Sequence, residues 1–385
     1  MGEKGEIDRK MKIEQIVKSL EEQMAIDKEF FWNNPEPGLR EIHTSAYIKK
    51  RLEKMGYIDV DTNVYATGIV ATLKGKEEGP CILFRSDMDA VIMDDTGRVK
   101  HTCGHDAHMT ILLSLAQILI NNQSKIKGTI KLLFQPDEEG NGGANQMIEK
   151  GVLENPKVDK AFAIHVWSEI KEDCIAIKKG AVMASTNPFE ITISGKGGHA
   201  AMPEKCIDTI YIANKIGMAI KEMSRNEESE EKVVLGVTAI TGGKNNNVIP
   251  DKVYLKGICR TFNNEIREKI KLDLKNKVEK IATEMGGKVE FKFIGNYPAV
   301  INSEEEAKEI QNLSTKIVQN VEKNYKTMCS EDFSFFLQKV PGAMIFVGCQ
   351  QEEYYPQHNE NFTVGIKPIL IGTQLFYEIV KRYMM

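Results

Sequence analysis

The amino-acid sequence predicts an α/β fold with a mostly parallel sheet, interrupted by a smaller inserted α+β domain. Three observations indicate this fold. Apolar segments of strand length alternate with helical segments through the first half of the chain. Several of these apolar segments run directly into polar residues. Beyond residue 186, strands with alternating polar and apolar residues accompany two long helices. With 385 residues, the chain has the length of roughly two or three domains.

The first half of the chain begins with two predicted helices. Residues 11–32 carry apolar side chains at helical spacing, and the Pro- and Gly-containing residues 34–38 end this helix. Residues 44–55 predict a second helix, which Gly56 ends, and residues 109–120 predict an apolar third one. The predicted strands of this region cover residues 68–73, 81–85, 128–134 and 160–164. Because helical segments separate these strands, we expect a mostly parallel sheet.

Polar residues of the types that bind metals follow three of these strands. Asp87 and Asp89 follow the second strand. Glu138 and Glu139 follow the third, and His165 follows the fourth. In such sheets, sites form beyond the carboxyl ends of the strands. Sequence order therefore gathers these side chains at one edge of the predicted sheet.

The densest cluster of such residues is HTCGHDAH, residues 101–108, which holds three of the seven histidines, one cysteine and one aspartate. Sulfur, imidazole and carboxylate bind borderline transition metals. Gly104 permits a tight turn, so that neighbours on either side can point the same way. We interpret the stretch as half of a metal site. The alternative is a polar loop of hydrogen-bonded histidines beside the buried Cys103, with His108 capping or packing at the start of a helix.

Residues 186–295 have a different pattern. A Gly-rich loop with His199 (residues 195–203) follows the first strand of this region, and residues 225–232 form a charged loop. The predicted elements are strand 189–194, helix 207–223, strands 233–240 and 253–261, helix 265–284 and strand 288–294. The order β-α-β-β-α-β is that of a ferredoxin-like domain. It is inserted between residues 1–185 and 296–385, which together form the first domain and end in helix 369–384.

Composition excludes several classes of function. Hydrophobic residues make up 42% and charged residues 28%, which fits a globular protein. A net charge of −4 indicates no nucleic-acid partner. No apolar run approaches a membrane span, and no apolar segment follows the charged N-terminus as in a secretory signal. The seven scattered cysteines predict free thiols and a cytoplasmic location.

The candidate ligands suffice for two metal ions, or for one ion with spare positions: Cys103, His105, Glu139, His165 and His358, which lies in the loop 354–362. Two ions can polarise a carbonyl and lower the pKa of a water, and hydrolysis then needs a base. Of Glu138 and Glu139, one can bind metal while the other stays free as the base. Because neighbours on a strand point opposite ways, a turn after Pro136 must bring both to the site. Asp87 and Asp89 are expected to orient a ligating histidine. The competing interpretation of the Glu138–Glu139 pair is a solvated acidic turn.

A series of motifs resembles one known family: RSDMDA (85–90), HTCGHDAHM (101–109), FQPDEEG (134–140), AIHV (163–166), GKGGHAAMP (195–203), NVIPD (247–251), CSEDFSFF (329–336) and QHN (357–359). The family is that of the metal-dependent amidohydrolases, with N-acyl-amino-acid hydrolases, hippurate hydrolase, N-acetyldiaminopimelate deacetylase and the auxin-conjugate amidohydrolases of plants. The resemblance covers nearly the whole chain in order. It implies a zinc-peptidase-like catalytic domain with an inserted lid or dimerisation domain.

The resemblance also implies a role for each candidate residue. Glu138 would be the general base, and Asp89 would support the metal site. Asp87 takes a position that is a histidine ligand in related carboxypeptidases. His199 would hydrogen-bond the oxyanion, from its own subunit or a dimer partner. The implied metal ligands are Cys103, His105, Glu139, His165 and His358, and the implied substrate neighbours are Asn247 and Arg260, a cation suited to a carboxylate.

The sequence thus predicts metal-dependent hydrolysis of the amide bond of N-acyl-L-amino acids. The expected cofactors are two divalent ions, with Zn, Mn, Co and Ni all suited to the mixed donor set. The expected partners are the small-molecule substrate and a second copy of the chain in a homodimer, with no membrane or nucleic acid. Two alternatives stay open: a dipeptidase or carboxypeptidase on the same scaffold, and a metal-binding protein without catalysis.

Overall fold

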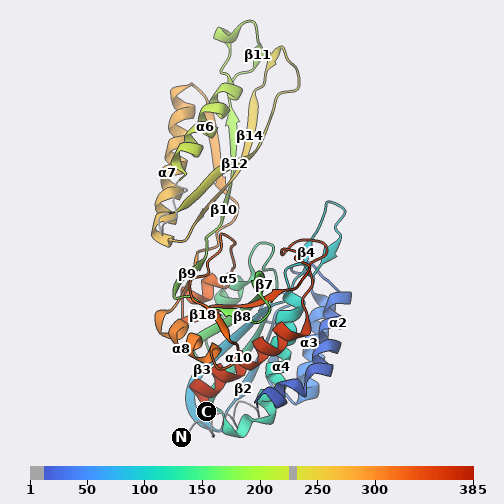
Figure 1. The fold of residues 1–385 in the computed structure, drawn as a ribbon. Coiled ribbons are helices and arrows are strands. Elements are labelled where there is room, and N and C mark those ends of the chain that lie inside the picture. Colours follow the sequence, from blue (N-terminus) through green and yellow to red (C-terminus); the bar gives the residue numbers. More distant parts are fainter. Residues whose placement is uncertain (1–12, 225–231) are drawn as a thin grey trace. The chain divides into compact units, whose positions relative to one another are not determined.

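The computed structural model describes residues 13–224 and 232–385 (Figure 1). The chain divides into two compact units. The first comprises Met1–Gly180, Ile301–Tyr325 and Phe335–Met385, as far as these are described, and the second comprises Ala181–Val300 and Lys326–Ser334. The second unit therefore extends beyond the predicted 186–295 at both ends and adds a later segment. The charged N-terminus and nearly all of the loop predicted over 225–232 lie outside the described residues.

The first unit is built on one sheet whose strands lie in the order β1-β2-β6-β3-β7-β18-β8-β17. The central strands β6, β3, β7 and β18 run parallel, while β1, β2 and β8 pair antiparallel with neighbours towards the two edges. The predicted α/β fold with a mostly parallel sheet is confirmed. The strands are β1 (Val60–Asp61), β2 (Ile69–Lys74), β3 (Glu77–Asp87), β6 (Lys127–Gln135), β7 (Lys160–Lys171), β8 (Cys174–Ala176), β17 (Asn320–Glu322) and β18 (Gly342–Gln350).

The helices of the first unit include α2 (Glu21–Asn33), α3 (Ile42–Met55), α4 (His105–Asn121), α5 (Gly143–Glu149), α8 (Glu304–Ser314) and α10 (Ile366–Met384), with the single turn η1 (Gln123–Lys125). The prediction of one helix over 11–32 is wrong, because residues 13–18 are helical and α2 begins anew at Glu21. Ser19 Oγ donates to the Ile16 carbonyl at 2.7 Å, and such side-chain bonds compete with the helical ladder. Residues 19 and 20 therefore form a turn between two helical segments.

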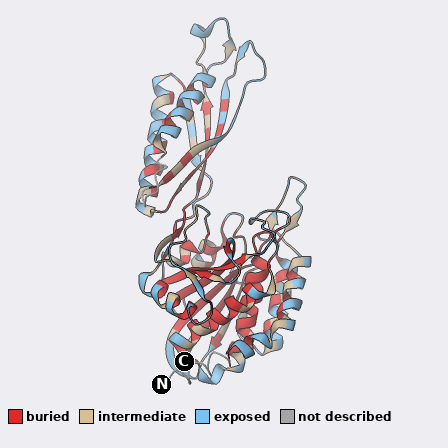
Figure 2. Cartoon of the chain, viewed as in Figure 1, coloured by how far each residue is buried: buried red, intermediate tan, exposed pale blue. Residues whose placement is uncertain are grey.

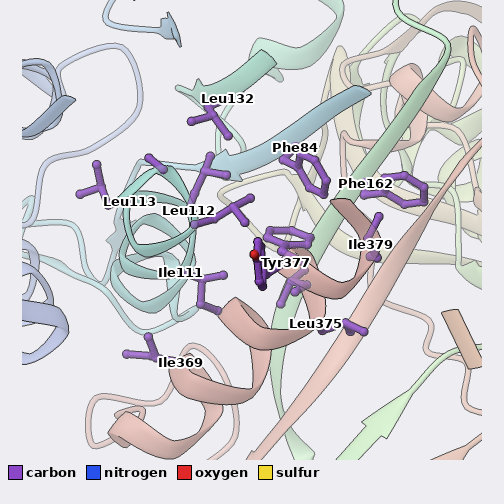
Figure 3. Close-up of a cluster of buried hydrophobic side chains, with 14 of the residues drawn as sticks. Phe84, Ile111, Leu112, Leu113, Leu132, Phe162, Ile369, Leu375, Tyr377 and Ile379 are labelled. Carbon is purple, nitrogen blue, oxygen red and sulfur yellow. The ribbon is translucent and has the colours of Figure 1, made fainter. Parts of the chain in front are cut away.

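Helix α4 is the central helix of this unit and packs against α2, α3 and α10. Its side chains are buried almost all round, as the apolar sequence predicts. In the core, Phe84 and Phe162 from the sheet meet Leu112 of α4 and Leu375 of α10 (Figure 3). Buried residues fill the centre of the unit, and exposed ones lie on the outer faces of its helices (Figure 2). This core fixes the end of α4 that carries the histidine cluster.

The second unit contains an antiparallel sheet in the order β12-β14-β10-β15 with helices α6 and α7 packed on it (Figure 1). Strict alternation of buried residues along β10 gives the sheet one buried face. Asp208 and Asn263 begin the two helices by accepting backbone N–H groups of the first turns. The elements are β10 (Asn187–Ser194), α6 (Thr209–Met223), β12 (Val233–Gly242), β14 (Lys252–Thr261), α7 (Asn264–Glu284) and β15 (Lys288–Phe293), in the predicted β-α-β-β-α-β order.

Short elements complete the fold. They are β4 (Val91–Ile92), β5 (Val99–Lys100), β9 (Gly180–Met183), β11 (Gly198–His199), η2 (Pro203–Lys205), β13 (Val248–Ile249), β16 (Val300–Asn302) and α9 (Ser334–Leu337). Within the described ranges, none of the helices combines the length and apolar character that a membrane crossing requires.

Candidate metal centre

The first half of the site is the turn that begins α4. Gly104 has φ +93°, and a Cβ there would lie 2.3 Å from Val166 Cγ2. Only glycine fits this position, because the conformation and the contact both exclude a side chain. The helix begins at His105 rather than at the predicted residue 109. His105 and His108 consequently lie one turn apart on the helix, with ring centroids 5.4 Å apart.

The second half is the turn that follows β6. Asp137 adopts φ +61°, a left-handed conformation uncommon for residues other than glycine. This turn ends the strand alternation and lets both of the next two acids face one site, as the sequence analysis requires. A carboxylate oxygen of Glu138, one of Glu139 and a nitrogen of His105 all lie within 4.8 Å of one another.

Two groups of donor atoms form around one sulfur. Cys103, His105 and His165 make one group, and Cys103, Glu139 and His358 make the other, each with its donor atoms within 4.8 Å of one another. Cys103 Sγ lies 3.6 Å from His165 Nε2, and His358 Nε2 lies 3.1 Å from Glu139 Oε1. Ligands of one tetrahedral ion lie roughly 3.4 Å apart, given bonds of about 2.1 Å. Each group would therefore suit a metal ion, and Cys103 is a candidate ligand in both groups.

Hydrogen bonds fix which histidine nitrogens face the donor groups. His105 Nδ1 lies 2.8 Å from the Asp89 carbonyl, and His165 Nδ1 lies 2.7 Å from the Val166 carbonyl, so each donates from Nδ1. In the neutral form of each ring, which is the form that binds a metal, Nε2 is left as an acceptor. His105 Nε2 is buried without a hydrogen-bond partner among the described residues. A cation would satisfy this nitrogen, so the donor set fits a metal.

The cluster carries several carboxylates in a buried place, and their charges set its pKa values. Burial raises the pKa of the Cys103 thiol well above its usual range, and Glu139 and Glu138 raise it further. Burial alone would lower the pKa of His105, but Asp87, Asp89 and Glu139 outweigh it and raise that pKa to about 10. Burial opposes ionisation of Glu139, yet His358 and His105 hold its pKa below the usual range. The carboxylates around His105 therefore stabilise positive charge at this site.

A row of buried polar side chains lies behind the ligands, and Arg85 is the member of this row that the sequence did not predict. Asp87 accepts a hydrogen bond from His108 Nδ1 at 2.6 Å and pairs with Arg85 at 2.8 Å. His108 Nε2 in turn accepts the Val166 N–H at 2.9 Å. Asp87 was expected to orient a ligating histidine, but its direct partner is His108, and it reaches His105 Nε2 only at 3.7 Å. Arg85 at the end of an apolar strand segment could have indicated a buried partner for the Asp87 carboxylate.

Asp89 contacts the proposed ligands more directly. Its carbonyl accepts from His105, and its Oδ2 accepts the Glu139 N–H at 2.9 Å. One residue therefore orients the ring of one candidate ligand and the backbone of another.

The other three predicted site residues belong to the second unit. His199 lies on β11, exposed, and the next residue, Ala200, donates its N–H to the Asn247 carbonyl at 2.9 Å. Arg260 lies half-buried on β14, and its Nη1 donates to the Met328 carbonyl at 2.6 Å. The structure thus brings His199 and Asn247 together. The roles predicted for all three residues stay predictions.

Comparison with known proteins places this geometry in a family. The model of peptidase family M20/M25/M40 matches residues 83–382. The chain is 34% identical to thermostable carboxypeptidase 2 of Saccharolobus solfataricus, over 94% of this chain and 95% of that protein. It is 33% identical to N-acetyl-L-cysteine deacetylase of Bacillus subtilis, over 94% and 89%.

A solved structure of the same family is similar to this chain in fold. The Bacillus subtilis YXEP protein, described as a dinuclear metal binding peptidase from the M20 family, superposes with a TM-score of 0.80 at 27% identity, over 94% of this chain and 98% of that one. The chain therefore belongs to peptidase family M20/M25/M40 and is a metal-dependent amidohydrolase.

Proposed function

We propose that this protein hydrolyses the amide bond of N-acyl-L-amino acids, with two divalent ions in the candidate metal centre. The observation that carries the proposal is the sharing of Cys103 by two donor groups, with Glu138 beside them. Relatives that act on acylated amino acids, such as the N-acetyl-L-cysteine deacetylase, support the choice of substrate.

The residues divide between two ions. Cys103, His105 and His165 would hold one, and Cys103, Glu139 and His358 would hold the other. When bound, the ions would polarise the scissile carbonyl and lower the pKa of a water molecule. The mixed sulfur, nitrogen and oxygen donors suit Zn, Mn, Co or Ni. The YXEP protein, with its dinuclear site, supports a pair of ions rather than one.

Glu138 moves the proton in this proposal. Its side chain is buried, and the turn at Asp137 aims it at the same place as Glu139 and His105. Glu138 takes a proton from the attacking water and later gives it to the amine that leaves. An adjacent pair of acids is needed because a carboxylate that binds an ion is no longer free to act as the base.

Residues of the second unit would bind the substrate. His199 is proposed to donate a hydrogen bond to the oxyanion, from its own subunit or from a partner in a homodimer. Arg260 is proposed to bind the carboxylate of the amino-acid part, which the charge of its guanidinium favours. Asn247, beside His199, is proposed to contact the same substrate. The hydrogen bond from Arg260 Nη1 to the Met328 carbonyl supports this role, because it holds the guanidinium in place while its other N–H groups can bind a carboxylate.

The test combines metal analysis with a substrate panel. Purified protein is analysed for bound metal, and each candidate metal is then added back. Release of amino acid is measured from N-acetyl- and N-benzoyl-amino acids and from dipeptides. We expect about two ions per chain and release from the N-acyl compounds that a chelator abolishes. Metal binding without release from any compound would contradict the proposal and favour a non-catalytic metal protein.

The second candidate function is that of a dipeptidase or carboxypeptidase. It is supported by the 34% identity to a thermostable carboxypeptidase over nearly the full length of both chains. The same panel separates the two functions, because a peptidase would release amino acid from the dipeptides and not from the N-acyl compounds.

A further inference from the structure

Glu41 is a buried carboxylate outside the proposed metal ligands. It precedes the first residue of α3, where a side chain normally accepts an N–H of the first helical turn. Its side chain makes no such bond. Instead, Oε1 accepts the backbone N–H of Asp137 at 3.1 Å, and Oε2 accepts the hydroxyl of Thr67. The carboxylate therefore joins the start of a helix to the turn that presents the acids of the site.

The turn at Asp137 is held from several directions. The Asp137 carbonyl accepts the N–H groups of Gly142 and Gly143 at 3.1 Å each. A Cβ at Gly38 would lie 2.2 Å from Asp137 Oδ1, so the backbone of residue 38 lies directly against this side chain. A non-glycine residue with positive φ persists only where its surroundings fix it. The segment 36–41 supplies one side of that support.

The backbone that follows Glu138 is held by a second carboxylate. Asp89 Oδ2 accepts the Glu139 N–H at 2.9 Å. The segment 36–41 also reaches this strand end, because the Glu36 carbonyl accepts the Ala90 N–H at 2.8 Å. Two carboxylates, Glu41 and Asp89, therefore bind the N–H groups of the residues on either side of Glu138.

We propose that Glu41 is a positioning residue for the general base, which acts by holding the left-handed turn at Asp137 so that Glu138 faces the metal centre. The inference rests on the proposed function, in which Glu138 moves the proton. A misplacement of about 1 Å can cost about 100-fold in rate, so a bond to the residue next to the base is expected to affect catalysis.

The chemistry of Glu41 suggests a conservative variant. Burial raises its pKa to about 7, although the hydrogen bond from Thr67 opposes the shift. The protonated and ionised forms both keep an oxygen that accepts the Asp137 N–H. A glutamine has the same shape and the same acceptor, so Glu41→Gln should preserve the turn, whereas Glu41→Ala removes the acceptor.

The experiment measures kcat, KM and metal content for the wild type, Glu41→Gln and Glu41→Ala. Glu306→Ala is the matched control, because Glu306 is also buried in the first unit but pairs with Lys160. We expect Glu41→Ala to lower kcat about 10- to 100-fold with KM and metal content unchanged. Glu41→Gln and Glu306→Ala should keep kcat. Folded Glu41→Ala with normal kcat would overturn the proposal, as would a loss of metal that accounts for the lower activity.

Two further measurements separate this inference from the proposed function. In the Glu138→Gln background, Glu41→Ala should cause no additional loss of kcat, and a full additional loss would overturn the positioning role. Amide hydrogen exchange at Asp137 should accelerate in Glu41→Ala but not in Glu41→Gln, and it needs no turnover. If Glu138→Gln keeps normal kcat, the proposed function fails, while the exchange result still reports on the turn.

Gly38→Ala perturbs the same turn through a different contact, the Asp137 side chain, and replaces Glu41→Ala as the test if that variant does not fold. Its new methyl group would displace the Asp137 side chain, so it should lower kcat with little change in KM. Normal kcat in a folded Gly38→Ala protein, together with unchanged exchange at Asp137, would count against the turn as the determinant of catalysis.

Discussion

The two units present the predicted site residues in opposite ways. In the first unit, the candidate ligands lie at the start of α4, after β6, within β7 and in the loop that carries His358. Cys103, His105 and His165 are buried, whereas His358 is exposed. In the second unit, His199 on β11 and Asn247 in the turn before β13 are exposed, and Arg260 on β14 is half-buried. The difference is that the core of the first unit holds most of the candidate ligands, whereas two of the three residues proposed to bind substrate are exposed on the second unit.

The largest effect is expected in the first unit, from Glu138→Gln. The variant removes the group that carries the proton but no proposed metal ligand, so kcat should fall about 10²- to 10⁴-fold while metal content stays normal. Steady-state kinetics with metal analysis measure both. The exposed Glu149→Gln on the nearby helix α5 is the control and should retain activity. Normal turnover in Glu138→Gln would remove this residue from its role.

In the second unit, His199→Ala should lower kcat about 10²- to 10³-fold without loss of metal, as expected for a lost oxyanion donor. His43→Ala, another exposed histidine, should have no effect. Mixing His199→Ala with the Glu138→Gln variant then tests whether the histidine acts across a dimer. Recovery of activity in the mixture would show that it does, and equal activity of His199→Ala and wild type would refute the role.

Cys103→Ala should weaken metal binding, whereas Glu138→Gln and His199→Ala should lower kcat and leave metal binding intact. Loss of the shared sulfur should weaken metal binding by more than the roughly 10- to 100-fold that loss of a supporting partner causes. Cys349→Ala is the matched control, since Cys349 is buried in the same unit outside the donor groups. Metal titration of both variants provides the measurement, and unchanged affinity in Cys103→Ala would contradict the ligand assignment.

The smallest effect is the pH dependence of metal binding. In the metal-free protein, burial raises the pKa of Cys103, and the surrounding acids raise that of His105 to about 10. Both groups therefore hold protons near neutral pH and must lose them to bind metal. Affinity should rise with pH by up to about tenfold per unit for each proton released. Calorimetric titration in buffers of different ionisation enthalpy counts these protons, and pH-independent affinity would contradict the expected release.

Much of the first unit could be predicted because strand and helix patterns were unambiguous. The strand ends at Asp87 and Gln135 lie within two residues of the predicted ends, but β7 continues to Lys171, so the prediction that His165 follows its strand is wrong. The start of α4 was placed four residues too late, because the polar residues 105–108 hide a helical turn that Gly104 begins. The break at Ser19 was missed, since apolar spacing continues through it. Local hydrogen bonds of this kind leave little trace in hydrophobic periodicity.

The supporting residues of the site were the least predictable. No motif assigns the partners of Arg85, His108 and Glu41, and each of these residues also contacts a segment at least 50 positions away in sequence. Glu41 meets Asp137 across 96 positions. Such contacts depend on which strands become neighbours, and pairing order is a property of the folded sheet.

The donor types, their spacing and the alternation of helices and strands can be read from the sequence, because they follow from side-chain chemistry and backbone periodicity. The folded chain is needed to show that Cys103 belongs to both donor groups, that Asp87 binds His108, and that Glu41 bonds to the turn at Asp137. The physical reason is that hydrogen bonds and shared ligands require separations of a few ångströms, which packing of the core sets and chain order does not.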